Sequence, residues 1–457
     1  MLEKKHRVHF VGIGGVGMSG IAEVLLNLGY FVSGSDLRES EATQRLRSLG
    51  AQISLGHREA NLVAKPSVVV ISTAVKFSNP EVLEARRLHI PVIPRAEMLA
   101  ELMRMKYGVA VAGSHGKTTT TSMIAAVLSA AGMDPTMVIG GRLRSLGSNA
   151  KLGQGDILVA EADESDGTFL LLSPTVAVVT NIDREHMDFH QTMDRLMESF
   201  LAFINKVPFY GLSVLCLDHP NVRALLPKVR KRFTTYGFSP EADFCARDLQ
   251  IHGMEVRFSV IHGSKCLGEL KLHLPGRHSA ANALAAVAVA QELEIPFSHV
   301  ATALESFTGI HRRFEIKGEL REVMVIDDYG HHPVEVEATI SAIRDGWKRP
   351  LTVVFQPHRY TRTRDLFDDF LISFEGTDRL ILTEIYEAGE EAIPGISGEA
   401  LYQAVKRRGH LDIEFIPDKT EIAKRLASKV KSGDIVLTLG AGDIYKVGEE
   451  LIEILRQ

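Results

Sequence analysis

The sequence has few cysteines, no excess of basic residues and no long apolar run, and each absence excludes a class of protein. Its three cysteines, Cys216, Cys245 and Cys266, include no C-x-x-C pair, which argues against a disulfide framework or a cysteine zinc site and suits a reducing compartment. Lys and Arg total 52 against 57 Asp and Glu, and this net charge of −5 disfavours a protein that wraps nucleic acid. No apolar stretch reaches the roughly 18 residues of a membrane span, and glycines interrupt the N-terminus before a signal-peptide core can form. We therefore expect a cytoplasmic protein without a nucleic-acid partner and without membrane insertion.

The remaining composition is that of an ordinary folded protein, with 45% hydrophobic and 24% charged residues. The 457 residues correspond to roughly three domains, and strand and helix patterns alternate along them without a sequence repeat. We predict three consecutive α/β domains: an N-terminal Rossmann-like parallel sheet over residues 1–106, a central P-loop ATPase-type domain over 107–308 and a C-terminal Rossmann-like domain over 309–457. The expected strands are Val8–Val11, Tyr30–Ser33, Val68–Ser72, Tyr107–Ala112, Ile157–Ala160, Val176–Thr180, Val323–Asp327, Leu351–Gln356, Arg379–Leu382 and Ile435–Leu439. The expected helices are Met18–Leu28, Ala42–Leu49, Asn79–Leu88, Lys117–Ala131, one from near Ser279 that buries Ala280–Ala290, and Val334–Ile343.

A glycine-rich loop between an expected strand and an expected helix predicts a nucleotide site. Glycines let the backbone approach a polyphosphate, and the N-terminus of the next helix presents unpaired N–H groups to it. Lys117 would then contact the β- and γ-phosphates, and the Thr118 hydroxyl would join a Mg²⁺ shell. The loop is shorter than the general P-loop pattern, and the alternative is a glycine turn that caps a helix. The candidate ATP-binding residues here are Ala112, Gly113, Ser114, His115, Gly116, Lys117 and Thr118.

Acidic residues follow the next expected strands, where a magnesium ion would need its ligands. In a parallel sheet, ligands gather at the carboxyl ends of the strands, and Glu161 is the first polar residue after one of them. Another strand leads to His186 and Asp188 at the same edge, with His190 close behind. The residues alone do not rank these histidines, and a solvated acidic loop is the alternative.

A second glycine motif, Gly12-x-Gly14-x-x-Gly17, lies between the first strand and the first helix. Asp36 follows about 20 residues further on, which completes a dinucleotide fingerprint with pyrophosphate at the helix N-terminus and the carboxylate on a ribose hydroxyl. A nicotinamide oxidoreductase is one interpretation of this motif. Any diphosphate ligand satisfies the same physics, so the motif alone does not choose among them.

The third unit contains two polar clusters at the ends of strands. The run from Asp327 to Pro333 holds two aspartates, a tyrosine and two histidines, for which a zinc site is the alternative. The second cluster contains Arg359 and Arg362, which one helical turn would point the same way. Two guanidinium groups on one side can bind a carboxylate through bidentate hydrogen bonds. The alternative is a basic turn that is simply exposed to solvent.

Eight segments together resemble the Mur ligase family of ATP-dependent amide-forming enzymes, over nearly the whole chain. The family's phosphate loop is G-[ST]-x-G-K-[ST], which accounts for the short spacing of Gly113 to Thr118. The resemblance implies that the chain joins L-alanine to the lactyl carboxylate of UDP-N-acetylmuramate through an acyl phosphate, in peptidoglycan precursor synthesis. The segments are HFVGIGGVGMSGIAEVL, GSHGKTTTTSM, VAEADESD, TNIDREHMDFH, PGRHSAANALAAVA, FTGIHRRFE, DDYGHHPVE and FQPHRYTRTRDL.

The resemblance also implies roles for individual residues, with ATP and Mg²⁺ as cofactors. Around magnesium it implies Thr118, Glu161 and His186. Near ATP it implies Lys117, His278, Asn282, Arg313 and Asp328, with Ser279 departing from the asparagine that the family usually has. For the UDP-sugar it implies Gly12, Gly14, Gly15, Gly17, Met18, Ser19, Ser35, Asp36, Ser72 and Ala74. For the amino acid and the reacting centre it implies Tyr329, His331, His358, Arg359 and Arg362, with His331 or His358 taking the proton of the amine.

Four rival functions remain at this stage. A sister ligase would attach a recycled tripeptide to the same UDP-sugar, and a folate polyglutamate ligase would share the phosphate loop but not the N-terminal unit. An oxidoreductase would leave the GKTTT segment without a role. A nucleotide switch would not explain candidate residues on three domains.

Overall fold

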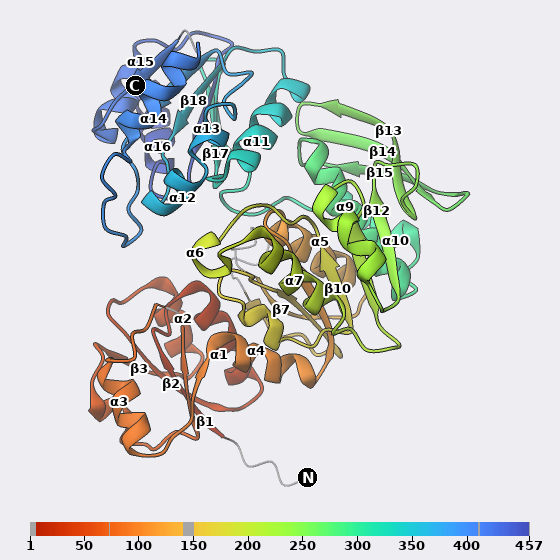
Figure 1. The fold of residues 1–457 in the computed structure, drawn as a ribbon, viewed down its shortest axis with the longest axis vertical. Coiled ribbons are helices and arrows are strands. Elements are labelled where there is room, and N and C mark those ends of the chain that lie inside the picture. The colour runs from red at the N-terminus through yellow and green to blue at the C-terminus, as the bar shows by residue number, and fades with distance from the viewer. Residues whose placement is uncertain (1–5, 73, 140–149, 410–411, 457) are drawn as a thin grey trace. The chain divides into compact units, whose positions relative to one another are not determined.

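The computed structural model, drawn in Figure 1, describes residues 6–72, 74–139, 150–409 and 412–456. Its internal contacts divide it into two compact units. The first unit contains the described residues up to Arg247, together with Ser259–Leu270 and Ala281–Phe307. The second contains Asp248–Phe258, Lys271–Ala280 and the described residues from Thr308 onward. We describe each unit by itself.

The N-terminal sheet is entirely parallel, in the order β3-β2-β1-β4-β5. Strand β1 lies at the centre, where Phe10 and Val11 are fully buried. The chain order reverses between β1 and β4, and this is the point where open parallel sheets bind ligands at the carboxyl ends of their strands. The strands are β1 (Arg7–Val11), β2 (Phe31–Asp36), β3 (Gln52–Leu55), β4 (Val68–Ile71) and β5 (Val92–Pro94). The helices are α1 (Val16–Asn27), α2 (Glu41–Ser48), α3 (Pro80–Arg87) and α4 (Arg95–Arg104), with the 3₁₀ turn η1 (Glu59–Leu62).

The central sheet runs in the order β15-β14-β13-β12-β11-β10-β6-β9-β7-β8. Strand β6 pairs in parallel with both β10 and β9, so the loop after β6 leaves the middle of the parallel part of the sheet. The first strands are β6 (Tyr107–Ala112), β7 (Thr136–Val138), β8 (Ala150–Lys151), β9 (Ile157–Glu161) and β10 (Val176–Val179). The later strands are β11 (Leu212–Cys216), β12 (Phe233–Gly237), β13 (Phe244–His252), β14 (Glu255–His262) and β15 (Lys265–Leu272). The helical segments are α5 (Lys117–Ala130), η2 (Thr168–Leu171), α6 (Met187–His190), α7 (Met193–Ile204), α8 (Pro220–Leu225), η3 (Leu226–Lys228), α9 (Arg277–Glu292) and α10 (Phe297–Glu305).

The C-terminal sheet has the order β16-β17-β21-β18-β19-β20, with β16 antiparallel to β17 and the other neighbours parallel. Its core includes Phe355 on β18, whose ring lies 5.5 Å from that of Phe370 and 5.2 Å from that of Phe374. The strands are β16 (Glu315–Leu320), β17 (Val323–Asp328), β18 (Leu351–Phe355), β19 (Arg379–Leu382), β20 (Ile413–Phe415) and β21 (Ile435–Leu439). The helical segments are α11 (Pro333–Gly346), α12 (Tyr360–Asp365), α13 (Phe367–Phe370), α14 (Gly398–Arg408), η4 (Lys419–Glu421), α15 (Ile422–Ala427) and α16 (Tyr445–Arg456).

These sheets confirm the predicted α/β class. Every expected strand is present, three of them with the predicted ends and the others with ends that differ by one to three residues. The expected buried helix is α9, in which Ala280 and Ala283 to Ala290 are buried. The stretch from β11 to β15 had no predicted strand, although β14 alternates buried and exposed residues along its length. Within the described part of the chain, none of the helices has the length and apolar character needed to cross a membrane. The domain boundaries at residues 106 and 308 stay a prediction.

Candidate active site

The loop between β6 and α5 is shaped by two glycines with left-handed backbone angles. Gly113 has a φ of +135° and Gly116, the N-cap of α5, a φ of +79°. A Cβ on Gly113 would collide with the Thr180 hydroxyl, and one on Gly116 would lie 2.8 Å from Oδ1 of Asn282. A side chain at either position would clash with these neighbours. The two glycines therefore allow the compact turn before α5 that is typical of phosphate-binding loops.

The segment after β10 holds this loop in place. Asn181 makes two hydrogen bonds with the backbone of His115: its Oδ1 accepts from the N–H at 2.7 Å and its Nδ2 donates to the carbonyl at 3.0 Å. The backbone N–H of Asp183 donates to Oγ of Ser114 at 2.8 Å. The Asp183 carboxylate lies 3.3 Å from the imidazole of His115 and 3.2 Å from that of His219. Burial alone would raise the pKa of Asp183, but hydrogen bonds to these imidazoles hold it well below its usual range.

The side chain of Lys117 lies against a buried carboxylate. Its Nζ donates to Oε1 and Oε2 of Glu164 at 2.8 and 3.0 Å and also to the Gly113 carbonyl. Burial would lower the pKa of Lys117, but the surrounding carboxylates, Glu164 first, raise it above its usual value. Burial raises the pKa of Glu164 to about 7, while the positive charge of Lys117 opposes that rise. A phosphate group that binds Lys117 therefore competes with Glu164.

Side chains suited to a hard cation form two groups beside the loop. In the first, Oγ1 of Thr118 donates to Oε2 of Glu161 at 3.2 Å. In the second, ligand atoms of Glu164, Glu185 and His186 lie within 4.8 Å of one another. The predicted metal set of Thr118, Glu161 and His186 is thus divided between the two groups, and its role stays a prediction.

The structure separates the two histidines that the sequence left as alternatives. His186 begins α6 with a φ of +55° and belongs to the second group of cation-suited side chains. His190 is 3% exposed, and its Nε2 donates to the backbone carbonyl of Glu164 at 2.9 Å, so this ring positions the acidic segment. Sequence reasoning passed over Glu164 and Glu185, which lie inside the quoted acidic motifs but are not the first polar residues after their strands.

Helix α9 carries the two residues predicted to lie near adenine. Asn282 is 8% exposed and its Oδ1 accepts from the Thr120 hydroxyl at 3.1 Å, which fixes it beside the start of α5. His278 is exposed and belongs to the other compact unit. The hydroxyl of Ser279 donates to the Pro275 carbonyl at 2.7 Å, four residues earlier, so its hydrogen is engaged by the backbone just before the helix.

The N-terminal glycine motif forms a tight turn between β1 and α1. Gly12 has a φ of +77° and its N–H donates to the Ser35 carbonyl at 2.8 Å, while Gly15 is the N-cap of α1. The N–H of Gly14 donates to Oδ2 of Asp36 at 2.8 Å, and a Cβ on Gly14 would lie 2.9 Å from that oxygen. Asp36, whose carboxylate is predicted to bind a ribose hydroxyl, thus also stabilises the glycine turn through this hydrogen bond.

The other residues predicted for the UDP-sugar differ in exposure. Met18 and Ser19, in the first turn of α1, are 2% and 6% exposed. Ser35 is fully buried, and its hydroxyl donates to Oε2 of Glu81 at 2.6 Å. The hydroxyl is thus engaged inside the domain and is not exposed to a ligand. Ser72, directly after β4, is half-buried and Ala74 is exposed.

In the second unit, the loop after β17 is held by Asp328. Its Oδ2 accepts from the N–H of Phe314 and its Oδ1 from the N–H of Gly330, both at 2.7 Å. Burial raises the pKa of Asp328 to about 6, although the nearby Arg313 opposes the rise. The guanidinium carbon of Arg313 lies 5.0 Å from the centre of the Tyr329 ring. The residue predicted for the ribose therefore also shapes the backbone around Tyr329.

Two predicted histidines meet at the carboxyl edge of the C-terminal sheet. The ring centres of His331 and His358 lie 5.5 Å apart. The Tyr386 ring stacks on that of His358, with a centre-to-centre distance of 5.5 Å and an interplanar angle of 9°. Nδ1 of His331 lies 3.0 Å from the Tyr329 carbonyl, and Nη1 of Arg362 lies 3.2 Å from Nδ1 of His358. Tyr386 is a contact that the sequence did not reveal, because it comes from a different strand end.

Arg359 has an unusual backbone and an unsatisfied side chain. Its φ is +71°, and its N–H donates to the Tyr386 carbonyl at 2.9 Å. Its buried Nε has no hydrogen-bond partner among the described residues. A strained residue with a buried unpaired donor is typical of a ligand site.

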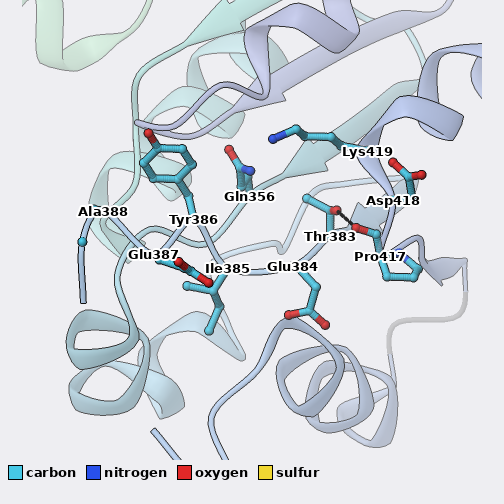
Figure 2. Close-up of a pocket in the computed structure, with 11 residues that line it drawn as sticks. Gln356, Thr383, Glu384, Ile385, Tyr386, Glu387, Ala388, Pro417, Asp418 and Lys419 are labelled. Atoms are coloured by element: carbon cyan, nitrogen blue, oxygen red, sulfur yellow. Dashed lines mark hydrogen bonds between the residues drawn. The ribbon is translucent and has the colours of Figure 1, made fainter. Parts of the chain in front are cut away.

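Tyr386 also lines a cavity of about 540 Å³. Figure 2 shows the side chains around it. Gln356, directly after β18, and Lys419, the first residue of η4, both line this region, and the Thr383 hydroxyl donates to the Pro417 carbonyl at 3.2 Å (Figure 2). The cavity lies within the second unit and adjoins the predicted amino-acid-binding residues through Tyr386. Its lining residues are Gln356, Thr383, Glu384, Ile385, Tyr386, Glu387, Ala388, Gly389, Pro417, Asp418 and Lys419.

We expect His358 to remain neutral throughout the pH range of an activity assay. Burial, followed by the positive charges of His331, Arg362 and Arg359, lowers its pKa to about 3. The folded state disfavours the charged ring, so the ring takes up a proton only as the pH falls toward that value. NMR of protein with ¹³C-labelled histidine should show a His358 resonance, assigned by its loss in His358→Gln, that does not titrate between about pH 5 and 9. A midpoint near 6.5 would contradict this expectation.

Together, the phosphate loop on a parallel sheet, its buried lysine and the acidic side chains beside it define a nucleotide-binding α/β protein. Three family profiles match the chain: "Mur ligase family, catalytic domain" over residues 7–107, "Mur ligase middle domain" over 111–290 and "Mur ligase, glutamate ligase domain" over 312–442. The chain belongs to the Mur ligase family.

Individual relatives agree with this assignment. A UDP-N-acetylmuramate–L-alanine ligase of Geotalea daltonii is 58% identical over all of both chains, and one of Myxococcus xanthus is 57% identical over 98% of this chain and 95% of its own. The crystal structure of UDP-N-acetylmuramate–alanine ligase from Thermotoga maritima has a TM-score of 0.82 at 30% identity, covering 99% of each chain. A murein peptide ligase from Psychrobacter arcticus, at 23% identity and a TM-score of 0.72 over 98% of each chain, shares the fold.

Proposed function

We propose that this chain joins L-alanine to the lactyl carboxylate of UDP-N-acetylmuramate, with cleavage of ATP to ADP and phosphate, as a cytoplasmic step of peptidoglycan precursor synthesis. The observation that carries the proposal is the 58% identity over the full length of both chains to a ligase of that name. The phosphate loop and its charged surroundings support it from the side of the chemistry.

The residues around the phosphate loop supply the charge that the first step needs. In that step an oxygen of the lactyl carboxylate attacks the γ-phosphorus, and the bond to the β,γ-bridging oxygen breaks to release ADP. The helix N-terminus of α5 and the ammonium of Lys117 stabilise negative charge on the transferred phosphoryl group. Glu164 releases Lys117 as the phosphates enter.

The oxygen-rich side chains beside the loop fit a magnesium ion. Carboxylates with a hydroxyl are the ligands that Mg²⁺ takes in phosphoryl-transfer sites, and Thr118, Glu161, Glu164 and Glu185 offer them, with His186 in addition. When bound, the cation would offset charge on the transferred phosphoryl group.

The second step needs a base, and the hydrogen bonds favour His331. The amine nitrogen of L-alanine attacks the acyl carbon, phosphate leaves, and the ammonium proton must be removed. A carbonyl only accepts, so His331 donates from Nδ1 to Tyr329 and carries its lone pair on Nε2. A guanidinium only donates, so Nδ1 of His358 accepts from Arg362, which places its proton on Nε2. We assign proton removal to His331, and to His358 the donation of a hydrogen bond.

Phosphate release from Mg-ATP with UDP-N-acetylmuramate tests the proposal. The reaction is run with L-alanine, with the tripeptide of the sister ligase, and with neither. We expect release only with both the sugar nucleotide and L-alanine, and a product heavier by one alanine residue in the mass spectrum.

Two outcomes would overturn this assignment. Phosphate release that requires the sugar nucleotide and the tripeptide, and does not occur with L-alanine, would place the chain with the sister ligase. No release from folded protein that binds ATP would remove the ligase activity altogether.

A further inference from the structure

Arg95 lies at the ligand-binding edge of the N-terminal sheet. It is the first residue of α4 and directly follows β5, whose last residue is Pro94. Because β5 is parallel to β4 and β4 to β1, the residue after β5 lies at the same edge as the glycine turn after β1. A cation therefore stands on the edge where the UDP-sugar is proposed to bind.

The third glycine of the fingerprint accommodates this guanidinium. A Cβ on Gly17 would lie 3.1 Å from both Cδ and Cζ of Arg95 and closer still to Nη1. Gly17 belongs to the first turn of α1, whose N-cap is Gly15. The missing side chain thus lets the guanidinium lie directly against the helix N-terminus, where the helix dipole also favours an anion.

The ion pair between Arg95 and Asp163 is long and partly exposed. Nη2 of Arg95 lies 3.8 Å from Oδ2 of Asp163, at the outer limit of an ion pair, and their side chains are 31% and 46% exposed. Exposed pairs of this geometry contribute little to stability. Asp163 adjoins Glu164 in the acidic segment that meets Lys117. A diphosphate, with more charge and more acceptor oxygens than Asp163, readily displaces it from the guanidinium.

We propose that Arg95 binds the diphosphate of the sugar nucleotide, together with the N-terminus of α1. The proposal rests on the proposed function for the presence of a sugar nucleotide. A guanidinium presents two parallel N–H donors to phosphate oxygens, which a lysine ammonium does not reproduce. Before the ligand arrives the Arg95 guanidinium lies beside Asp163, and Gly17 keeps open the space in which it lies.

Calorimetric titration of the whole protein with UDP tests this role. We expect Arg95→Ala to weaken UDP binding by about ten- to a hundredfold, and Arg95→Lys to recover only part of the loss. Gly17→Ala should weaken UDP binding similarly, because the new methyl group displaces the guanidinium. Arg104→Ala, at the exposed far end of α4, is the matched control and should bind UDP as the unaltered protein does. ATP binding should stay unchanged in Arg95→Ala, which also shows that the variant is folded.

Comparing the binding of UDP with that of UDP-N-acetylmuramate distinguishes the outcomes that would contradict the proposal. Unchanged UDP binding by Arg95→Ala with weaker UDP-N-acetylmuramate binding would assign Arg95 to the lactyl carboxylate and overturn the diphosphate contact. Unchanged binding of both ligands would remove Arg95 from the site. Absence of binding of either ligand by the unaltered protein would instead overturn the proposed function, and the Arg95 contact with it.

Discussion

Replacing Lys117 by alanine is expected to reduce phosphate release from ATP by about a thousandfold or more, because the transferred phosphoryl group would lose the cation that we propose stabilises its charge. The measurement is the rate of phosphate release at saturating ATP, UDP-N-acetylmuramate and L-alanine. Lys151→Ala, which removes a lysine paired with Asp134 at the surface of the same unit, is the control and should keep the full rate. A folded Lys117→Ala protein with an undiminished rate would contradict the assignment.

The same substitution also affects folding, and a second variant separates the two effects. Lys117→Ala leaves Glu164, 1% exposed, without its ammonium partner. Removing one member of a buried ion pair typically costs about 3–5 kcal/mol, although a carboxyl group with a pKa of about 7 avoids part of this cost by taking up a proton. The double variant Lys117→Ala/Glu164→Gln should therefore have a higher Tm than Lys117→Ala and remain equally inactive. Recovery of activity in the double variant would show that the orphaned carboxylate, rather than the missing lysine, caused the loss.

Replacing Arg359 by alanine should raise the KM for L-alanine by about a hundredfold and leave that for ATP within about twofold. Bidentate hydrogen bonds to a carboxylate are worth about 1.5–3 kcal/mol, and the unpaired Nε of Arg359 is one of the donors already in place for them. Steady-state kinetics with each substrate varied in turn give the two constants. Arg364→Ala is the control, since Arg364 lies on the neighbouring helix turn, 51% exposed and paired with Asp365. Equal changes in both constants would move Arg359 out of the amino-acid site.

Arg359→Lys distinguishes charge from geometry in that site. A lysine keeps the positive charge but presents no planar pair of donors, so the KM should lie between those of the unaltered protein and Arg359→Ala. A KM equal to that of the unaltered protein would show that charge alone is recognised.

Local signals were enough to predict the fold class and the two glycine loops. A strand, a glycine turn and a helix are adjacent in the sequence, and the left-handed angles of Gly12, Gly113 and Gly116 account for the glycines there. The strands β11 to β15 were not predicted; β14, for example, alternates buried residues with more exposed ones and has no continuous apolar run. The outer strands of the central sheet therefore had no signal as clear as the apolar runs of β6 and β10.

Contacts between distant segments explain the rest of what the sequence did not reveal. The partner of Lys117 is Glu164, which is reached only when β6 and β9 pair, and Tyr386 meets His358 only where β18 and β19 lie side by side. Arg95 belongs to the same class, since nothing in the spacing of Gly17 points to it. In each case an expected residue lies beside a neighbour from a distant part of the chain that its own motif does not contain.

The contact between Lys117 and Glu164 has a consequence for which anions the resting protein retains. A small anion such as inorganic phosphate must replace two hydrogen bonds to a carboxylate with the few contacts that it can make itself. A nucleoside triphosphate has three phosphate groups with which to contact the helix N-terminus and the loop N–H groups, so it offsets the same competition with more contacts. We therefore expect the resting protein to bind a nucleoside triphosphate much more tightly than inorganic phosphate, so that phosphate released in one reaction delays the next nucleotide little.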